Sequence, residues 1–189
     1  MSVGWQVTLI VLWVVVLMQT TLILVLFRQV GLVYLGRRDA RARDGLPLRS
    51  LAPAWEAADL TGRVQASSLF GQRPLLLVFA EPGCAPCKEF LPELREFARQ
   101  HESDLNTVVV GTDSDDQNRE MAREYQLEVP VLTQSRRSIS ADYRVFASPF
   151  VYFIDEEGVI RDKGVVNFRV QLEEKLRALA SRRLHEVVA

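Results

Sequence analysis

Apolar and polar positions follow one another in blocks along the chain, and the blocks predict two kinds of structure. The first apolar block runs from Trp5 to Phe27 without a charged side chain. Further along, short apolar runs of strand length alternate with stretches in which apolar residues recur every three or four positions. This pattern predicts a long apolar helix followed by a domain in which strands and helices alternate.

The elements of the second part can be placed by residue range. A strand-and-turn lead-in is expected over 55–69, strands at 74–80, 106–111, 130–133, 150–155 and 159–165, and helices at 86–100, 116–127 and 170–184. The fully apolar strands should be buried on both faces. Parallel strand–helix–strand units followed by an antiparallel hairpin give an α/β fold with a mixed central sheet flanked by helices.

The N-terminal block has the length of a membrane span. At about 1.5 Å per residue, residues 5–27 make a helix of roughly 34 Å, enough for a hydrocarbon core near 30 Å. A cleaved signal peptide has a basic start, a shorter apolar stretch and a small-residue cleavage site, and a buried core helix has a polar face. We therefore expect a single transmembrane helix within residues 1–35, which contacts membrane lipid through residues 5–27. An Arg-rich juxtamembrane linker over 36–53 then leads to a globular domain over 54–189.

Charge and cysteine content exclude some classes of function. The formal net charge is -1, whereas a nucleic-acid-binding protein usually carries a clear basic excess. A zinc site built on the two cysteines would need histidine or carboxylate ligands, and both His101 and His185 stand alone in the sequence. We expect no metal and no cofactor.

Cys84 and Cys87 lie where a predicted buried strand gives way to a helix. A helix N-terminus carries partial positive charge and unpaired backbone N–H groups, which stabilise a thiolate at Cys84 and make it the nucleophile. Ala85 and Pro86 separate the cysteines by one turn, which brings the sulfurs within disulfide reach, and Pro86 suits the first turn of a helix. Cys87 should be more buried and act as the resolving thiol. Two cysteines at this spacing can also be packing residues, but C-x-P-C at a strand-to-helix junction indicates a redox-active disulfide.

At these residues the chain resembles the thioredoxin superfamily, over roughly residues 52–180. The resemblance rests on the segment LLLVFAEPGCAPCKEFLPEL, on Ser148–Pro149 directly before FVYFIDEEG, and on the hairpin IDEEGVI. Within the superfamily the chain is similar to membrane-anchored redoxins of the TlpA and MauD types. The resemblance implies a thioredoxin-like fold and a thiol–disulfide oxidoreductase that acts on client disulfides or dithiols. It also implies an upstream redox partner, for which a membrane protein is one option, and an accessory role in maturing a disulfide-rich periplasmic enzyme.

The same resemblance assigns residues outside the cysteine pair and exposes departures. Thioredoxins have a cis proline facing the cysteines, so Ser148–Pro149 is expected to be cis and to pair with a substrate segment through its backbone. A trans proline that merely begins an edge strand is the alternative. Gly83 stands where thioredoxins have Trp, Val78 where they have a buried Asp, and Phe90 where cytochrome-maturation relatives have Glu. The familiar proton-handling acids are therefore missing.

Two other functions remain open from the sequence. A peroxiredoxin-like peroxidase would need Pro seven residues and Thr three residues before its reactive cysteine, where this chain has Leu77 and Glu81. A Glu81 side chain beside the cysteines would replace the missing proton-handling acid, but we expect this side chain to lie in solvent. A non-enzymatic assembly module would use the fold as a binding platform only, and the cysteine pair argues against that function.

Two signals disagree on the side of the membrane. Five arginines lie between Arg28 and Arg43, after the apolar block, and none precedes it. The positive-inside rule therefore places the domain in the cytoplasm, whereas the resemblance places it on the extracytoplasmic side. We adopt the extracytoplasmic side, because folded domains can be translocated despite nearby positive charge.

Overall fold

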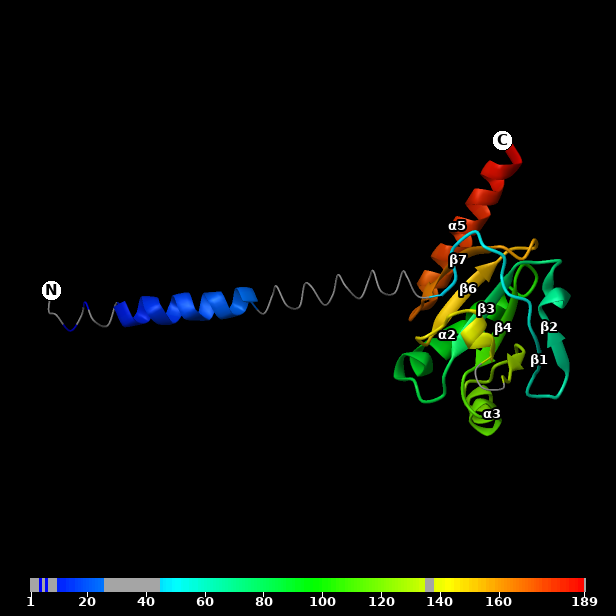
Figure 1. Cartoon of the computed structure of the whole chain (residues 1–189), viewed down its shortest axis with the longest axis horizontal. Coiled ribbons are helices and arrows are strands. Elements are labelled where there is room, and N and C mark those ends of the chain that lie inside the picture. Colours follow the sequence, from blue (N-terminus) through cyan, green and yellow to red (C-terminus); the bar gives the residue numbers. More distant parts are fainter. Residues whose placement is uncertain (1–3, 5, 7–9, 26–44, 135–137, 189) are drawn as a thin grey trace. The chain divides into compact units, whose positions relative to one another are not determined.

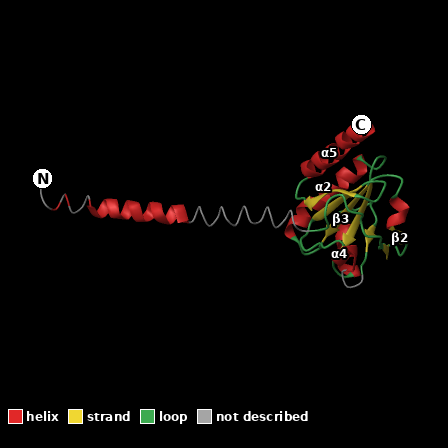
Figure 2. Ribbon diagram, turned by 45° about the horizontal axis from the view of Figure 1, so that its top comes forward, coloured by secondary structure: helices red, strands yellow, loops and turns green. Residues whose placement is uncertain are grey.

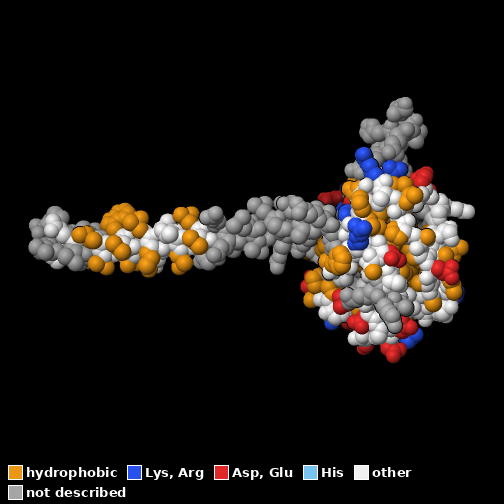
Figure 3. Space-filling model, in the orientation of Figure 1, with side chains coloured by type: hydrophobic (Ala, Val, Ile, Leu, Met, Phe, Trp, Pro, Cys, Tyr) orange, Lys and Arg blue, Asp and Glu red, His pale blue; other side chains and the backbone are white. Residues whose placement is uncertain are grey.

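The structure is a computed structural model, and it describes residues 4, 6, 10–25, 45–134 and 138–188. The chain divides into two compact units, Met1–Arg43 and Asp44–Ala189. In the first unit residues 10–25 are helical, and large apolar side chains are exposed along this helix (Figures 1 and 3). Among the described residues, no helix is both long enough and apolar enough to cross a membrane. Part of the predicted span over 5–27 and half of the predicted linker over 36–53 lie outside the described residues.

The second unit is an α/β domain (Figures 1 and 2). Its strands are β1 (Glu56–Ala58), β2 (Val64–Ala66), β3 (Leu75–Ala80), β4 (Asn106–Gly111), β5 (Val131–Leu132), β6 (Phe150–Ile154) and β7 (Ile160–Val165). Its helices are η1 (Ser67–Phe70), a 3₁₀ helix, and α2 (Ala85–Gln100), α3 (Asp115–Glu124), α4 (Ser138–Asp142) and α5 (Arg169–Val188).

A five-stranded mixed sheet lies at the centre of this unit, in the order β5-β4-β3-β6-β7. β3 pairs in parallel with β4, and β4 with β5, whereas β3–β6 and β6–β7 are antiparallel. β1 and β2 form a separate antiparallel pair. The predicted mixed central sheet flanked by helices is confirmed.

The central strand β3 contributes to both halves of the core, because successive side chains of a strand point to opposite faces. Leu76 and Val78 pack with α2, α3 and α5 on one face, and Leu77 and Phe79 pack with α4 and the N-terminal part of the domain on the other. All four side chains are fully buried. This two-sided burial explains why the strand appears in the sequence as an unbroken apolar run.

Two short helices, η1 and α4, were not expected from the sequence, because four or five residues are too few to display a helical period. The other expected elements are present, with ends that differ by one to three residues in most cases. The largest difference is α5, which continues to Val188 rather than ending at Leu184.

The segment 45–53, which we call the strap, is paired with the domain rather than being a free linker. The backbone N–H of Arg49 donates to the Ile160 carbonyl at 2.7 Å, and the N–H of Ile160 donates to the Ser50 carbonyl at 2.9 Å. The strap thus covers part of the edge strand β7, which would otherwise expose unpaired backbone groups. Residues 49–52 of the predicted linker thus pair with the domain through their backbone.

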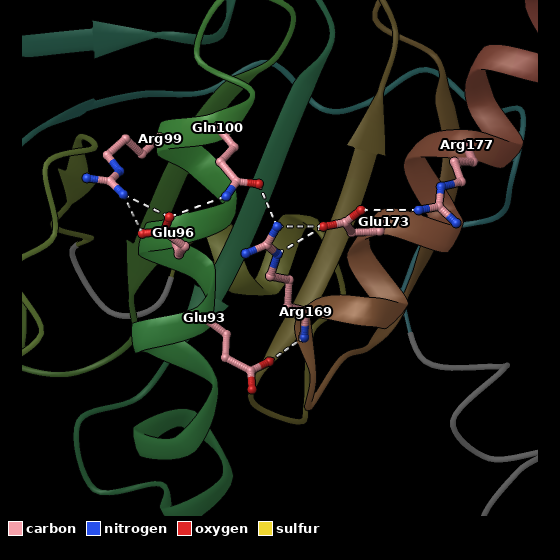
Figure 4. A network of polar contacts seen from close by, with 7 residues as sticks. All are labelled: Glu93, Glu96, Arg99, Gln100, Arg169, Glu173 and Arg177. Carbon is pink, nitrogen blue, oxygen red and sulfur yellow. Dashed lines mark hydrogen bonds and ion pairs between the residues drawn. The ribbon is translucent and has the colours of Figure 1, made fainter.

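Charged side chains fasten α5 to α2, the helix that begins at the cysteines (Figure 4). The backbone N–H of Arg169, the first residue of α5, donates to the Glu93 carboxylate of α2. The Arg169 guanidinium contacts Glu173 at 2.8 Å and Gln100 at 2.5 Å. The first turn of α5 is thereby capped by a side chain of α2, and the two helices keep a fixed register.

Candidate active site

Cys84 occupies the N-cap position of α2. Its backbone is extended, with φ -82° and ψ 115°, and its Sγ accepts a hydrogen bond from the Cys87 backbone N–H at 3.3 Å. The Cys84 carbonyl accepts the first helical bond from the Lys88 N–H at 3.2 Å. Pro86 stands in the first turn, where a missing N–H costs nothing. Because the Cys87 N–H points toward Cys84 Sγ at the positive end of the helix, it favours negative charge on that sulfur.

Cys87 lies behind Cys84, as the sequence predicts. Its exposed fraction is 0%, whereas Cys84 is half-buried. Burial raises the pKa of the Cys87 thiol well above its ordinary range, and the hydrogen bond between the two thiols raises it further. Cys87 therefore keeps its proton at neutral pH, so Cys84 is the sulfur available to react first.

The loop before β6 faces the cysteines. The Ser148–Pro149 peptide bond is cis. The Cys84 thiol donates a hydrogen bond to the Ser148 carbonyl at 3.2 Å, although the two residues are 64 positions apart in the chain. Pro149 is buried and Ser148 half-buried. The fold thus brings together the four residues for which the sequence predicts direct roles.

The rim around Cys84 is uncharged and open. Gly83, Ala85 and Pro86 are exposed, and a Cβ on Gly83 would meet no atom within 4 Å. Phe146, two residues before Ser148, has an exposed fraction of 86%, the highest among the exposed large apolar side chains of the described residues. Nothing in the local sequence singles out Phe146. The sequence feature that could have pointed to Phe146 is its position two residues before Ser148–Pro149.

Comparison with known proteins places this site in a family. The model of the AhpC/TSA family matches residues 48–163. The chain belongs to the AhpC/TSA family. It is 30% identical over 176 residues to the methylamine utilization protein MauD of Paracoccus versutus, with 89% of this chain and 86% of MauD covered. The predicted resemblance to MauD-type redoxins is confirmed.

Two further similarities bear on the enzyme class and the fold. The chain is 28% identical to the thiol-disulfide oxidoreductase YkuV of Bacillus subtilis, over 64% of this chain and 83% of YkuV. A secreted Mycobacterium tuberculosis disulfide oxidoreductase homologous to E. coli DsbE superposes with a TM-score of 0.58 at 22% identity, over 66% of this chain and 95% of that one. The second similarity shows the fold alone. The similarity to MauD and to YkuV assigns the chain to the thiol–disulfide oxidoreductases.

Apolar side chains fill the two positions at which thioredoxin-like family members carry an acid. Val78 on β3 and Phe90 on α2 both have an exposed fraction of 0% and belong to the same half of the core. Glu81 is half-buried, rather than fully in solvent as expected, and its negative charge adds to the rise of the Cys87 pKa. The influence of this charge on the Cys87 pKa is smaller than those of burial and of the Cys84 thiol, and a backbone hydrogen bond at Glu81 acts in the opposite direction.

The geometry suits two successive sulfur-exchange steps. One sulfur is accessible and receives an N–H hydrogen bond, and the second is buried one helical turn further on. The Ser148 carbonyl beside Cys84 lies in the non-helical segment that leads into β6, so backbone groups there lie next to the attacking sulfur. An extended peptide placed along this segment would bring its own sulfur to Cys84.

Proposed function

We propose that the chain is a membrane-tethered thiol–disulfide oxidoreductase that reduces or exchanges disulfides of client proteins through the Cys84–Cys87 dithiol. The observation that supports this most strongly is the N-cap position of Cys84, with its Sγ 3.3 Å from the Cys87 N–H and the Cys87 thiol fully buried behind it. A pair of cysteines used only for packing would not need one sulfur exposed at a helix N-terminus.

The reaction begins at the client disulfide. The Cys84 thiolate attacks one client sulfur, the client S–S bond breaks, and the second client sulfur leaves as a thiolate that takes up a proton. A mixed disulfide now joins Cys84 to the client. Cys87 then loses its proton and attacks Cys84 Sγ, which releases the first client sulfur as a thiolate. Two electrons have passed from the enzyme to the client, and a Cys84–Cys87 disulfide remains.

The second step needs a base for the Cys87 proton, because burial favours the protonated thiol. The departing client thiolate is one acceptor, since it is formed at Cys84 in the same step. The reaction can also run in reverse, in which case the Cys84–Cys87 disulfide oxidises a client dithiol to a disulfide and is itself reduced to the dithiol. The net direction is set by the reduction potentials of the enzyme, the client and the upstream redox partner.

The tether and the side of the membrane belong to the same proposal. Residues 4–27 carry no charged side chain, and Leu17 and Leu24 in the described helix over 10–25 have exposed fractions of 60% and 65%, which suits contact with lipid. We place the domain on the extracytoplasmic side, with a role in maturing a disulfide-containing client, as suggested by the similarity to MauD proteins. Reporter fusions at the C-terminus, active only outside the cytoplasm, test this orientation.

Trapping the mixed disulfide tests the chemistry. The full-length Cys87→Ser variant in detergent micelles should accumulate a disulfide-linked adduct with a protein disulfide substrate such as insulin, because the resolving sulfur is gone. Cys84→Ser is the matched control and should form no adduct. Equal adducts from both variants, or none from either, would contradict the assignment of Cys84 as the nucleophile.

The alternative functions give different results in related assays. A peroxidase would consume hydrogen peroxide at a rate that depends on Cys84, whereas the proposed enzyme should not. A binding module would keep its biological function after Cys84→Ser, whereas the proposed enzyme should lose it.

A further inference from the structure

We propose that Tyr152 is a positioning residue for the thiol–disulfide site, because its hydroxyl fastens the strap to the turn that precedes the Ser148 loop. The proposal rests on the proposed exchange at Cys84 and adds a residue that acts on the site through other residues. A chain of contacts leads from the strap, through Tyr152, to the carbonyl that faces Cys84.

Tyr152 is a buried strand residue whose hydroxyl bonds on both sides. It lies in the middle of β6 and has an exposed fraction of 0%. Its hydroxyl donates to the Tyr143 carbonyl at 2.6 Å and accepts from the Leu46 backbone N–H at 2.8 Å. One hydroxyl therefore joins three separate segments: the strap, the end of α4 and the sheet. A buried tyrosine hydroxyl usually has such partners, since leaving it unpaired is costly.

The strap is shaped to reach this hydroxyl. Gly45 has φ +80°, and a Cβ at this position would lie 2.1 Å from the Tyr152 hydroxyl oxygen. Only glycine allows the backbone this close and this conformation at little cost. The Gly45 N–H also donates to the Arg144 carbonyl at 3.1 Å, so the strap holds the residue after Tyr143 as well.

The turn held in this way leads directly to the active-site loop. Residues 145–149 connect Arg144 to β6, and their carbonyl at Ser148 lies 3.2 Å from Cys84 Sγ. At one end this loop is fixed by the pairing of Phe150 with Phe79 and Val165 in the sheet. At the other end the Tyr143 and Arg144 carbonyls are held by Tyr152 and Gly45. Between these ends the Val145 N–H donates to the Ser140 carbonyl at 2.9 Å, whereas Phe146 is 86% exposed. The contacts at Tyr143 and Arg144 therefore contribute to where Ser148 lies.

Loss of the Tyr152 hydroxyl should change two rates in opposite directions. With the loop released, the Ser148 segment no longer presents its backbone to a client, and reduction of a protein disulfide slows. At the same time Cys84 Sγ loses the Ser148 carbonyl that lies against it at 3.2 Å, so a small reagent reaches the sulfur more readily. Alkylation of Cys84 by a small reagent should then become faster. A general loss of stability would also expose the buried Cys87 thiol to the reagent, so faster alkylation that stays confined to Cys84 marks the positioning role.

The test compares Tyr152→Phe with Tyr125→Phe in full-length protein in detergent micelles. Tyr125→Phe removes a tyrosine hydroxyl at the end of α3, where it donates to the Glu124 carboxylate at 3.0 Å, and leaves the contacts of the strap and of the turn after α4 in place. Tyr152→Phe should reduce insulin about fivefold more slowly than wild type and react with iodoacetamide about threefold faster. The control should match wild type in both rates. Alkylation reports on Cys84, because Cys87 is buried.

Gly45→Ala provides a second route to the same release, since its Cβ would displace the Tyr152 hydroxyl. It keeps the proposal testable if Tyr152→Phe fails to fold. Rates equal to wild type in both variants, or the same change in the Tyr125→Phe control, would overturn the proposal. If wild type does not reduce insulin, the proposed function fails, and the iodoacetamide rates still decide whether Tyr152 controls the environment of Cys84.

Discussion

Replacing Cys87 by alanine should remove a pH-dependent loss of stability from the reduced protein. The Cys87 thiol is fully buried, and burial raises its pKa well above the value of about 8.5 for an exposed cysteine. As the pH rises past that value, the unfolded chain releases the Cys87 proton while the native chain keeps it. Stability that is fully present below about pH 8.5 is therefore lost progressively at higher pH.

The magnitude follows from the titration of one unfolded thiol. Between pH 7.5 and pH 9.5, its ionisation favours the unfolded state by about 1.4 kcal/mol if the native thiol stays protonated. Wild type should lose about that much more free energy of unfolding than Cys87→Ala over this interval, because the two proteins differ in this one thiol. The alanine variant should start from a lower stability at pH 7.5, since it leaves a small cavity in the core.

The assay is urea unfolding of the full-length chain in detergent micelles with excess reductant, followed by far-UV circular dichroism. Both proteins are measured at pH 7.5 and pH 9.5. Equal losses of stability in the two proteins would refute the reasoning, because the native Cys87 thiol would then titrate like an exposed one. A smaller loss in wild type than in the variant would contradict it more strongly.

Three further predictions concern other parts of the domain. Phe146→Ala should leave the free energy of unfolding within about 0.5 kcal/mol of wild type, since the side chain is exposed, but should lower kcat/KM for a protein disulfide severalfold without changing the rate with dithiothreitol. Gly111→Ala should destabilise the protein by about 1–3 kcal/mol in the same unfolding assay, because the new Cβ would lie 2.3 Å from Asn118 Cγ, whose side chain is fully buried. Burial raises the pKa of Asp59, but hydrogen bonds from neighbouring side chains and backbone N–H groups lower it more, to about 2. The stability advantage of wild type over Asp59→Asn should therefore be present above about pH 4 and disappear as the pH falls toward 2, and a constant difference in acid-unfolding curves would contradict this.

Much of the fold could be read from the sequence, because its strongest signals are local. The run LLLVFA is buried on both faces, and the α2 stripe of Phe90, Leu94 and Phe97 faces the core. The two cysteines could be placed for the same reason: a strand end, a proline in the first helical turn and a two-residue spacing all lie within one short segment.

Other features depend on contacts between distant positions and could not be read in this way. The strap looked like part of a linker, because Gly45 and Pro47 are typical of turns and the partners of Gly45 and Leu46 lie about a hundred residues further on. The exposure of Phe146 results from how the turn after α4 enters β6. The half-burial of Glu81 depends on the packing at the end of β3.

Redox titration of the Cys84/Cys87 couple tests the central claim most directly. Full-length protein in detergent micelles is equilibrated with glutathione or dithiothreitol buffers of known potential, and free thiols are counted by mass-tagged alkylation. We predict a reversible two-electron transition that is absent from Cys87→Ser. A potential near or below about -250 mV would indicate a reductant of client disulfides, and one above about -200 mV an oxidant or isomerase. If no disulfide forms between the two cysteines at any potential, the chain is not a dithiol oxidoreductase, and the proposed exchange at Cys84 does not occur.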